Sequence, residues 1–402
     1  MAPAYSTPKP RLSLTEKLGL YFKLLFLAPP TLAFNLIRCF SIATVRGISY
    51  QHYARVASIK FLLRYLTPYQ LQTVVPPTVA AYKGWIRRRQ AQATQRITAD
   101  PSDKTAPFLA DRLKVDIEPL SDGISSILWI GDRAKATKCV YFFHGGGYAV
   151  PAGLGHFEWC MRAYLLATSE LPAGSTDEVA VAFLQYTLVP DGRYPTQLKQ
   201  AADGLAHLLA SGIQPENLVL GGDSAGANLT AQVLSHLLHP HPEARPLKLE
   251  APLAGAFLVS PWVSANTDTP SYDRNQGIDM LGKTTMRNIM KYIVDGRESY
   301  TAELKEKKGW CMPMDLDDPV EWYKGLENVV NKVYVTAGEE EVFLDQSVKF
   351  AQVVRDGNPK VDLRFEVTKG EAHDWLLMDG DKQMDGDATK RMRGWFKSVF
   401  WA

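Results

Sequence analysis

One stretch decides the fold: Leu218-Val219-Leu220-Gly221-Gly222-Asp223-Ser224-Ala225-Gly226-Ala227-Asn228. An apolar, strand-forming run enters a Gly-x-Ser-x-Gly turn, and a helix-forming run leaves it, which is the context that raises a serine hydroxyl at the end of a strand. Gly222 and Gly226 fit this turn because a side chain at either position would strike a neighbouring strand or helix. The amide of Ala225 is then expected at a helix amino end, where N–H groups stabilise an oxyanion.

A second glycine-rich turn precedes this one. The apolar run Cys139–Phe143 predicts a strand buried on both faces, and it ends in His144-Gly145-Gly146-Gly147. Amides in such a run are unobstructed, so two of them could join the amide of Ala225 in an oxyanion hole. The alternative is a flexible or phosphate-binding loop, but no Lys-Ser/Thr follows, which excludes a P-loop.

Strand and helix patterns alternate through most of the chain, which predicts the α/β class with a mostly parallel sheet of about eight strands flanked by helices. A period-two run at 115–120 and a second strand-forming run at 126–130 predict an antiparallel pair joined by a turn at 121–123. Further strands are expected at 139–143, 179–184, 255–262, 332–337 and 361–367, beside the one that enters the serine turn. Helices are expected at 197–209, 345–355 and about 381–400.

The chain divides into an apolar amino-terminal segment (1–50), a mixed helical region (51–112) and a catalytic domain (113–402). The strand–helix rhythm is lost between about 263 and 324, which we interpret as an apolar lid over the site, against the alternative of a purely structural insertion. In the first segment, Pro29 and Pro30 are expected to break or kink a helix. A signal-anchor or re-entrant hairpin, an interfacial segment and a helical pair packed on the domain remain open, and membrane association is the favoured reading.

A base and an acid are expected on two late loops. His373 is the one histidine that follows a late strand, and it is the candidate base for Ser224. The acid is expected in Gly338–Asp345, which contains several carboxylates. Loops after parallel strands meet at one edge of a sheet, so a hydroxyl, an imidazole and a carboxylate can converge there for acyl transfer.

Composition sets further limits. The chain has 402 residues, 46% of them hydrophobic, and a net charge of +2, so nothing favours a nucleic-acid partner. Its four cysteines are scattered, which fits reduced, buried thiols rather than a zinc site or a disulfide scaffold.

Together these motifs resemble the hormone-sensitive-lipase-like branch of the α/β-hydrolases. His144-Gly145-Gly146-Gly147 stands about 80 residues before Gly222-Asp223-Ser224-Ala225-Gly226, and Tyr186–Pro190 with Tyr194-Pro195 is similar to another segment of that branch. The resemblance implies an α/β-hydrolase fold from about Leu113 onward, Glu341 as the acid, and the amides of Gly146, Gly147 and Ala225 as oxyanion donors. Glu340 and Asp345 remain alternative acids, and Asp374 replaces the usual glycine after the histidine.

The resemblance also implies a serine esterase that needs no metal and no cofactor. An apolar lid and segment favour a lipophilic ester with a short acyl group, such as an acetylated sterol, terpenoid or polyketide, as for fungal or yeast membrane-bound members of the branch. We expect association with a membrane of the endoplasmic reticulum, with the cytoplasm as the alternative, and keep a homodimer as a hypothesis. The rival functions are amide or thioester hydrolysis, acyl transfer, and a non-catalytic receptor for small molecules.

Overall fold

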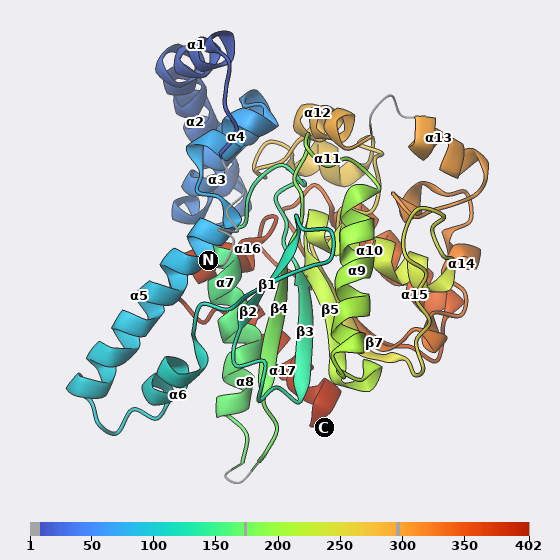
Figure 1. Cartoon of the computed structure of the whole chain (residues 1–402). Coiled ribbons are helices and arrows are strands. Elements are labelled where there is room, and N and C mark those ends of the chain that lie inside the picture. Colours follow the sequence, from blue (N-terminus) through green and yellow to red (C-terminus); the bar gives the residue numbers. More distant parts are fainter. Residues whose placement is uncertain (1–8, 173–174, 295–297, 402) are drawn as a thin grey trace.

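A single eight-stranded sheet organises the computed structural model, which describes residues 9–172, 175–294 and 298–401. The strand order is β1-β2-β4-β3-β5-β6-β7-β8 (Figure 1). The first two pairings, β1 with β2 and β2 with β4, are antiparallel, and all the others are parallel. The strands are β1 (Ile117–Pro119), β2 (Ser126–Ile130), β3 (Lys138–Phe143), β4 (Val179–Gln185), β5 (Leu218–Asp223), β6 (Leu253–Val259), β7 (Val330–Gly338) and β8 (Asp362–Thr368).

The α/β class and the mostly parallel sheet are therefore confirmed, including the antiparallel first pair. The alternation along β3 shows why the sheet is buried on both faces: Tyr141 and Phe143 belong to one apolar cluster, and Val140 and Phe142 to the other. Successive side chains of a strand point to opposite faces, so a continuous apolar run feeds two cores at once.

Helices cover both faces of the sheet (Figure 1). Residues of α9 (Thr196–Ala210), α10 (Ala225–Leu238) and α15 (Leu344–Gly357) pack in the first cluster. The second cluster takes side chains from α5 (Thr78–Ala99), α7 (Leu154–Cys160), the π-helical turn η2 (Met161–Leu165), α8 (Leu166–Ser169) and α17 (Asp387–Phe400). The expected final helix from about 381 begins only at Asp387, as α17, and a separate short helix, α16 (Trp375–Asp381), precedes it. Short 3₁₀ turns, η3 (Pro215–Asn217) and η5 (Leu326–Asn328), precede β5 and β7.

The amino-terminal region is helical, but its prolines do not break it. α1 (Leu14–Phe22), a π-helical turn η1 (Lys23–Leu27) and α2 (Ala28–Arg46) form one helical path of 33 residues. In the π turn the amide of Ala28 donates to the carbonyl of Lys23, five residues back. This wider turn lets the helical path continue through Pro29 and Pro30 at the start of α2. By length and composition this path could cross a membrane. The first eight residues of the expected 1–50 segment lie outside the described residues.

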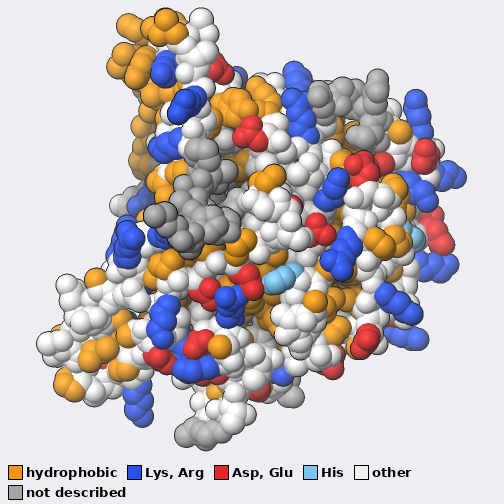
Figure 2. Space-filling model, in the orientation of Figure 1, with side chains coloured by type: hydrophobic (Ala, Val, Ile, Leu, Met, Phe, Trp, Pro, Cys, Tyr) orange, Lys and Arg blue, Asp and Glu red, His pale blue; other side chains and the backbone are white. Residues whose placement is uncertain are grey.

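Much of that path is exposed and apolar. Leu25, Phe26 and Ile37 are each 66% to 69% exposed. Figure 2 shows hydrophobic side chains gathered at the projecting end formed by α1 and the start of α2. The other side of α1 contacts α4 (Pro68–Val74), where the side chain of Gln70 donates to the carbonyl of Glu16. The amino-terminal helical region continues after α2 through α3 (Tyr50–Tyr65), α4, α5 and α6 (Thr105–Arg112).

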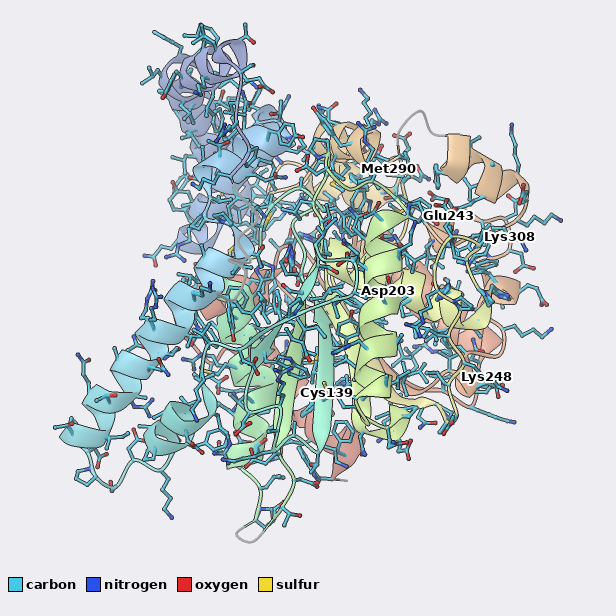
Figure 3. The ribbon with its side chains drawn as sticks, in the orientation of Figure 1. Cys139, Asp203, Glu243, Lys248, Met290 and Lys308 are labelled. Atoms are coloured by element: carbon cyan, nitrogen blue, oxygen red, sulfur yellow. The ribbon has the colours of Figure 1, made fainter. Side chains whose placement is uncertain are left out.

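In the described part of 263–324, where the strand–helix rhythm is lost, the elements are short helices: α11 (Pro270–Asn275), α12 (Lys283–Ile293), α13 (Glu298–Lys305), η4 (Pro313–Asp315) and α14 (Pro319–Trp322). In Figure 3, Cys139 lies at the start of β3 and Met290 of α12 lies beyond the opposite end of the strands. α12 therefore lies at the carboxyl edge of the sheet, where the serine turn also lies.

Candidate active site

Ser224 lies between β5 and α10 in a strained backbone conformation. Its φ is 51° and its ψ is −113°, values that a residue with a side chain adopts only when its surroundings impose them. A Cβ atom on Gly222 or Gly226 would overlap the carbonyl oxygen of Phe143 at the end of β3. The two glycines therefore allow the turn to pass under the neighbouring strand, as expected from the sequence.

His373 and Ser224 are in direct contact. The Nε2 atom of His373 lies 2.8 Å from Oγ of Ser224, and both side chains are buried. On the other side of the ring, Nδ1 lies 3.5 Å from Oε2 of Glu341, longer than an ordinary hydrogen bond, and among the described residues Nδ1 has no hydrogen-bond partner. Such contacts are often long before a substrate binds.

Of the three candidate acids, only Glu341 faces the imidazole in this way. The carboxylate of Glu340 pairs with Arg46, and that of Asp345 accepts the amide of Ser271 at 2.7 Å. Glu340 and Glu341 lie in the loop after β7, whereas Asp345 lies in the first turn of α15, and of the three only Glu341 is completely buried.

Ser260 is a neighbour of the site that the sequence analysis did not single out. Its hydroxyl donates to Oε2 of Glu341 at 2.6 Å and accepts the amide of Asp374 at 3.4 Å. Ser260 follows β6 at the same edge of the sheet, and its φ of 46° turns the chain there. A polar residue directly after a buried strand was the signal that could have revealed it.

Asp374 brings a second carboxylate to the imidazole. Its Oδ2 atom lies 3.1 Å from Nε2 of His373, the nitrogen that also contacts Ser224. Its Oδ1 atom is buried and, within the described part of the chain, has no hydrogen-bond partner. From the sequence, Asp374 was noted only as a replacement for the usual glycine after the histidine, and it adopts the left-handed conformation with a φ of 52°.

Burial alone would lower the pKa of His373, but the carboxylates of Asp374 and Glu341 outweigh it and raise that pKa well above its ordinary value. Burial raises the pKa of Asp374 to about 7, although the charge of His373 acts to lower that pKa. The imidazole thus lies in a strongly anionic, water-poor setting that favours its protonated form.

The glycine run after β3 lies against this site. The amide of Gly145 donates to Oδ2 of Asp223 at 3.0 Å, which ties the run to the serine turn. Gly146 and Gly147 have φ values of 98° and 60°, a region that glycine adopts without strain. Among the described residues, the amides of Gly146, Gly147 and Ala225 are hydrogen-bonded to no protein acceptor, so all three remain free to bind an oxyanion.

His144 has a structural role in holding this loop. Its ring stacks on Tyr186 with 4.3 Å between ring centroids, and the Tyr186 hydroxyl donates to the His144 carbonyl at 2.6 Å. Burial lowers the pKa of His144 to about 3, which keeps the ring neutral. His156, which the sequence did not point to, has its Nε2 atom 3.4 Å from Oδ2 of Asp223. Within the described residues, no group of three or more His, Cys, Asp or Glu side chains could hold a metal ion.

Comparison with known protein families agrees with this geometry. Residues 140–377, more than half of the chain, match the family model described as alpha/beta hydrolase fold. The chain belongs to the α/β-hydrolase fold family. The match begins in β3 and ends just after His373, so it spans the serine turn, the acid loop and the histidine.

The relatives of this α/β-hydrolase include esterases and deacetylases. It is 26% identical over 237 residues to an esterase of Acinetobacter venetianus, covering 58% of this chain and 66% of the relative. It is 28% identical over 216 residues to an arylacetamide deacetylase of Oryctolagus cuniculus, covering 50% of each. The matched part thus spans half to two thirds of the length of these relatives.

A solved esterase from the bacterial hormone-sensitive lipase family has a similar fold. The TM-score is 0.53 at 20% identity, over 79% of this chain and 98% of that one. This likeness shows the fold, and the family match together with the esterase and deacetylase relatives confirms the predicted resemblance to hormone-sensitive-lipase-like esterases.

Proposed function

We propose that this α/β-hydrolase is a serine carboxylic-ester hydrolase in which Ser224 is the nucleophile, His373 the base and Glu341 the acid. The observation that carries the proposal is the 2.8 Å contact between Oγ of Ser224 and Nε2 of His373. A serine hydroxyl becomes a useful nucleophile only when such a base removes its proton. The esterase names of the relatives support the same class of reaction.

In the proposed mechanism, Nε2 of His373 takes the Ser224 proton while Oγ attacks the ester carbonyl. The amides of Gly146, Gly147 and Ala225 bind the oxyanion of the tetrahedral intermediate. Glu341 stabilises the imidazolium, which then protonates the departing alcohol. Water repeats the cycle on the acyl-enzyme, releasing the carboxylic acid and restoring Ser224.

We further propose a lipophilic alcohol carrying a short acyl group, such as an acetylated sterol, terpenoid or polyketide. The buried side chains of Met286, Ile289 and Met290 give α12 an apolar inner face. A Cβ atom on Gly147 would lie 3.2 Å from Cδ1 of Ile289, so α12 contacts the proposed oxyanion loop and leaves little room there. In this proposal residues 263–324 form the lid that excludes water.

The exposed apolar face of the 14–46 helical path is proposed to bind a membrane, that of the endoplasmic reticulum in preference to a cytoplasmic location. Lys9, Arg11 and Lys17 lie near the start of the path and suit anionic headgroups. Membrane binding would place the site close to lipophilic esters. Resistance of the full chain to carbonate extraction would support insertion, and release by carbonate would support surface binding.

Hydrolysis of p-nitrophenyl acetate by the full chain and by Ser224→Ala tests the proposal. We expect Ser224→Ala to lower kcat by about 10⁶-fold, to the background level. A series of p-nitrophenyl esters tests the acyl preference, with acetate or butyrate expected above longer chains. Equal rates of the wild type and Ser224→Ala would contradict the proposed nucleophile.

Amide hydrolysis is the second candidate, because one of the relatives is named an arylacetamide deacetylase. Release of 4-nitroaniline from 4-nitroacetanilide, compared with p-nitrophenyl acetate, separates the two activities. Adding a competing alcohol and identifying the products distinguishes hydrolysis from acyl transfer. Tight ligand binding without any turnover would instead favour a receptor.

A further inference from the structure

Lys60 is a buried cation that the proposed mechanism does not use. It lies on α3 and is 6% exposed. Its Nζ atom donates to the carbonyl oxygens of Gln276, Asp279 and Leu281 at 2.7, 2.8 and 3.0 Å. An ammonium group has three donors, so all of them are engaged by one short segment of backbone. A charge is costly to bury, and here the charge fixes the path of residues 276–281.

The same segment holds the backbone on both sides of Glu341. Oδ2 of Asp279 accepts the amide of Val342 at 2.7 Å. The Nδ2 atom of Asn275 donates to the carbonyls of Glu341 and Glu339 at 2.8 and 3.0 Å. Asp279 and Asn275 are completely buried, so water does not replace these bonds. The position of the Glu341 side chain therefore depends on residues 275–281.

A second cation, at the end of α2, contacts residues 274–281. Arg46, the last residue of α2, donates to Oδ1 of Asn275 at 3.0 Å and to the carbonyl of Arg274 at 2.6 Å. It also pairs with the carboxylate of Glu340. Two amino-terminal helices thus contact one structural unit, which consists of residues 274–281 and the loop 339–342.

We infer that Lys60 and Arg46 are positioning residues that hold Glu341 against His373 through residues 274–281. The inference rests on the proposed role of Glu341 as the acid. It makes the amino-terminal helices part of the support of the active site, in addition to any role in membrane binding. A displacement of the acid by about 1 Å would cost about 10²-fold in rate, because the contact with Nδ1 is already long.

Lys60→Met in the full chain tests the inference, with Arg64→Met as the matched control. Arg64 lies one turn further along α3 and is exposed, so its replacement removes the same charge without touching the segment. We expect Lys60→Met to lower kcat for p-nitrophenyl acetate by about 10²-fold with little change in KM, and Arg64→Met to resemble the wild type. Equal kcat values for Lys60→Met and Arg64→Met would overturn the inference.

The pH profile separates positioning from general damage. The carboxylates that face His373 are those of Glu341, Asp374 and Asp279, and displacing Glu341 removes part of the stabilisation of the imidazolium. The acid limb of kcat/KM should then move to lower pH in Lys60→Met. A loss of activity that merely follows the loss of folded protein, with an unmoved acid limb, would overturn the inference.

A double-mutant cycle supplies the sharpest readout. If Lys60 acts through Glu341, adding Lys60→Met to Glu341→Gln should lower kcat little further, whereas independent effects would multiply. Multiplying effects would overturn the inference. If Lys60→Met does not fold, Arg46→Met serves in the same cycle, because Arg46 is more exposed. A wild type with no activity and no serine labelling would overturn the proposed function itself, and with it this inference, whereas a failed cycle in an active enzyme overturns the inference alone.

Discussion

Oδ2 of Asp374 lies 3.1 Å from Nε2 of His373, the nitrogen that the Ser224 hydroxyl also contacts at 2.8 Å. Nε2 can hold only one proton, and a carboxylate beside it favours that proton's presence. While Nε2 is protonated, it cannot accept the proton of Ser224. Asp374 therefore opposes the base form of His373 at low pH, an arrangement that a glycine at this position would not produce.

Replacing Asp374 should make the enzyme active at lower pH. Because the carboxylate raises the pKa of His373, its removal in Asp374→Asn lowers that pKa, and the base form appears at lower pH. We expect the acid limb of kcat/KM to move down by about one to two pH units. Asp374→Gly should do the same and also relieve the left-handed backbone at this position. A limb that stays in place, or moves to higher pH, would show that Asp374 does not act on the imidazole.

The identity of the acid can be settled with two isosteric substitutions. Glu341→Gln should lower kcat by about 10⁴-fold, because the imidazolium loses its stabilising charge and its tautomer is no longer fixed. Asp345→Asn is the matched control in the first turn of α15, where the carboxylate accepts the backbone amide of Ser271, and it should cost less than about tenfold. Steady-state kinetics on p-nitrophenyl acetate measures both, and the reverse order of effects would assign the acid to Asp345.

The serine turn should tolerate no side chain at its glycines. In Gly226→Ala the new Cβ would overlap the backbone of Phe143, so we expect a loss of about 3 kcal/mol or complete failure to fold. Gly394→Ala is the control: a Cβ on this residue of α17 meets nothing within 4 Å, and a gain of about 0.5 kcal/mol is expected. Urea unfolding gives both free energies. A Gly226→Ala variant as stable as the wild type would mean that the strand and the turn are less close than described.

Membrane binding should depend on the exposed apolar face of the amino-terminal helix. Phe26 is 67% exposed, and Phe26→Ser combined with Leu25→Ser should reduce flotation with anionic lipid vesicles by about tenfold or more. Met384→Ser removes a half-exposed apolar side chain elsewhere and should leave flotation unchanged. If the variant with Phe26→Ser and Leu25→Ser floats as well as the wild type and Met384→Ser do, the 14–46 helix is not the membrane-binding element.

Strands could be predicted because each apolar run has period two or is buried on both faces, as in β3. The serine turn could be predicted because Gly222 and Gly226 leave few alternatives to a tight strand–helix turn. The continuous helix across Pro29 and Pro30 could not, since it depends on a π-helical turn that no residue pattern announces.

The neighbours of the imidazole were harder to predict than the imidazole itself. Ser260 and Asp374 lie beside the imidazole on loops that are 114 residues apart in the sequence. These loops meet only because their strands end at the same edge of the sheet. The same holds for Lys60, whose partners lie more than 200 residues along the chain. A single sequence carries chain order and local pattern, but it does not specify which loops pack side by side.

The central claim is that His373 activates the Ser224 hydroxyl for attack on an acyl carbon. The most direct test is to treat the full chain with a fluorophosphonate, digest it and locate the adduct by mass spectrometry, in the wild type and in His373→Ala. The account predicts a single adduct on Ser224 that forms at least about 10³-fold more slowly without the imidazole. No adduct on Ser224 in the wild type, or an equally fast one in His373→Ala, would contradict it.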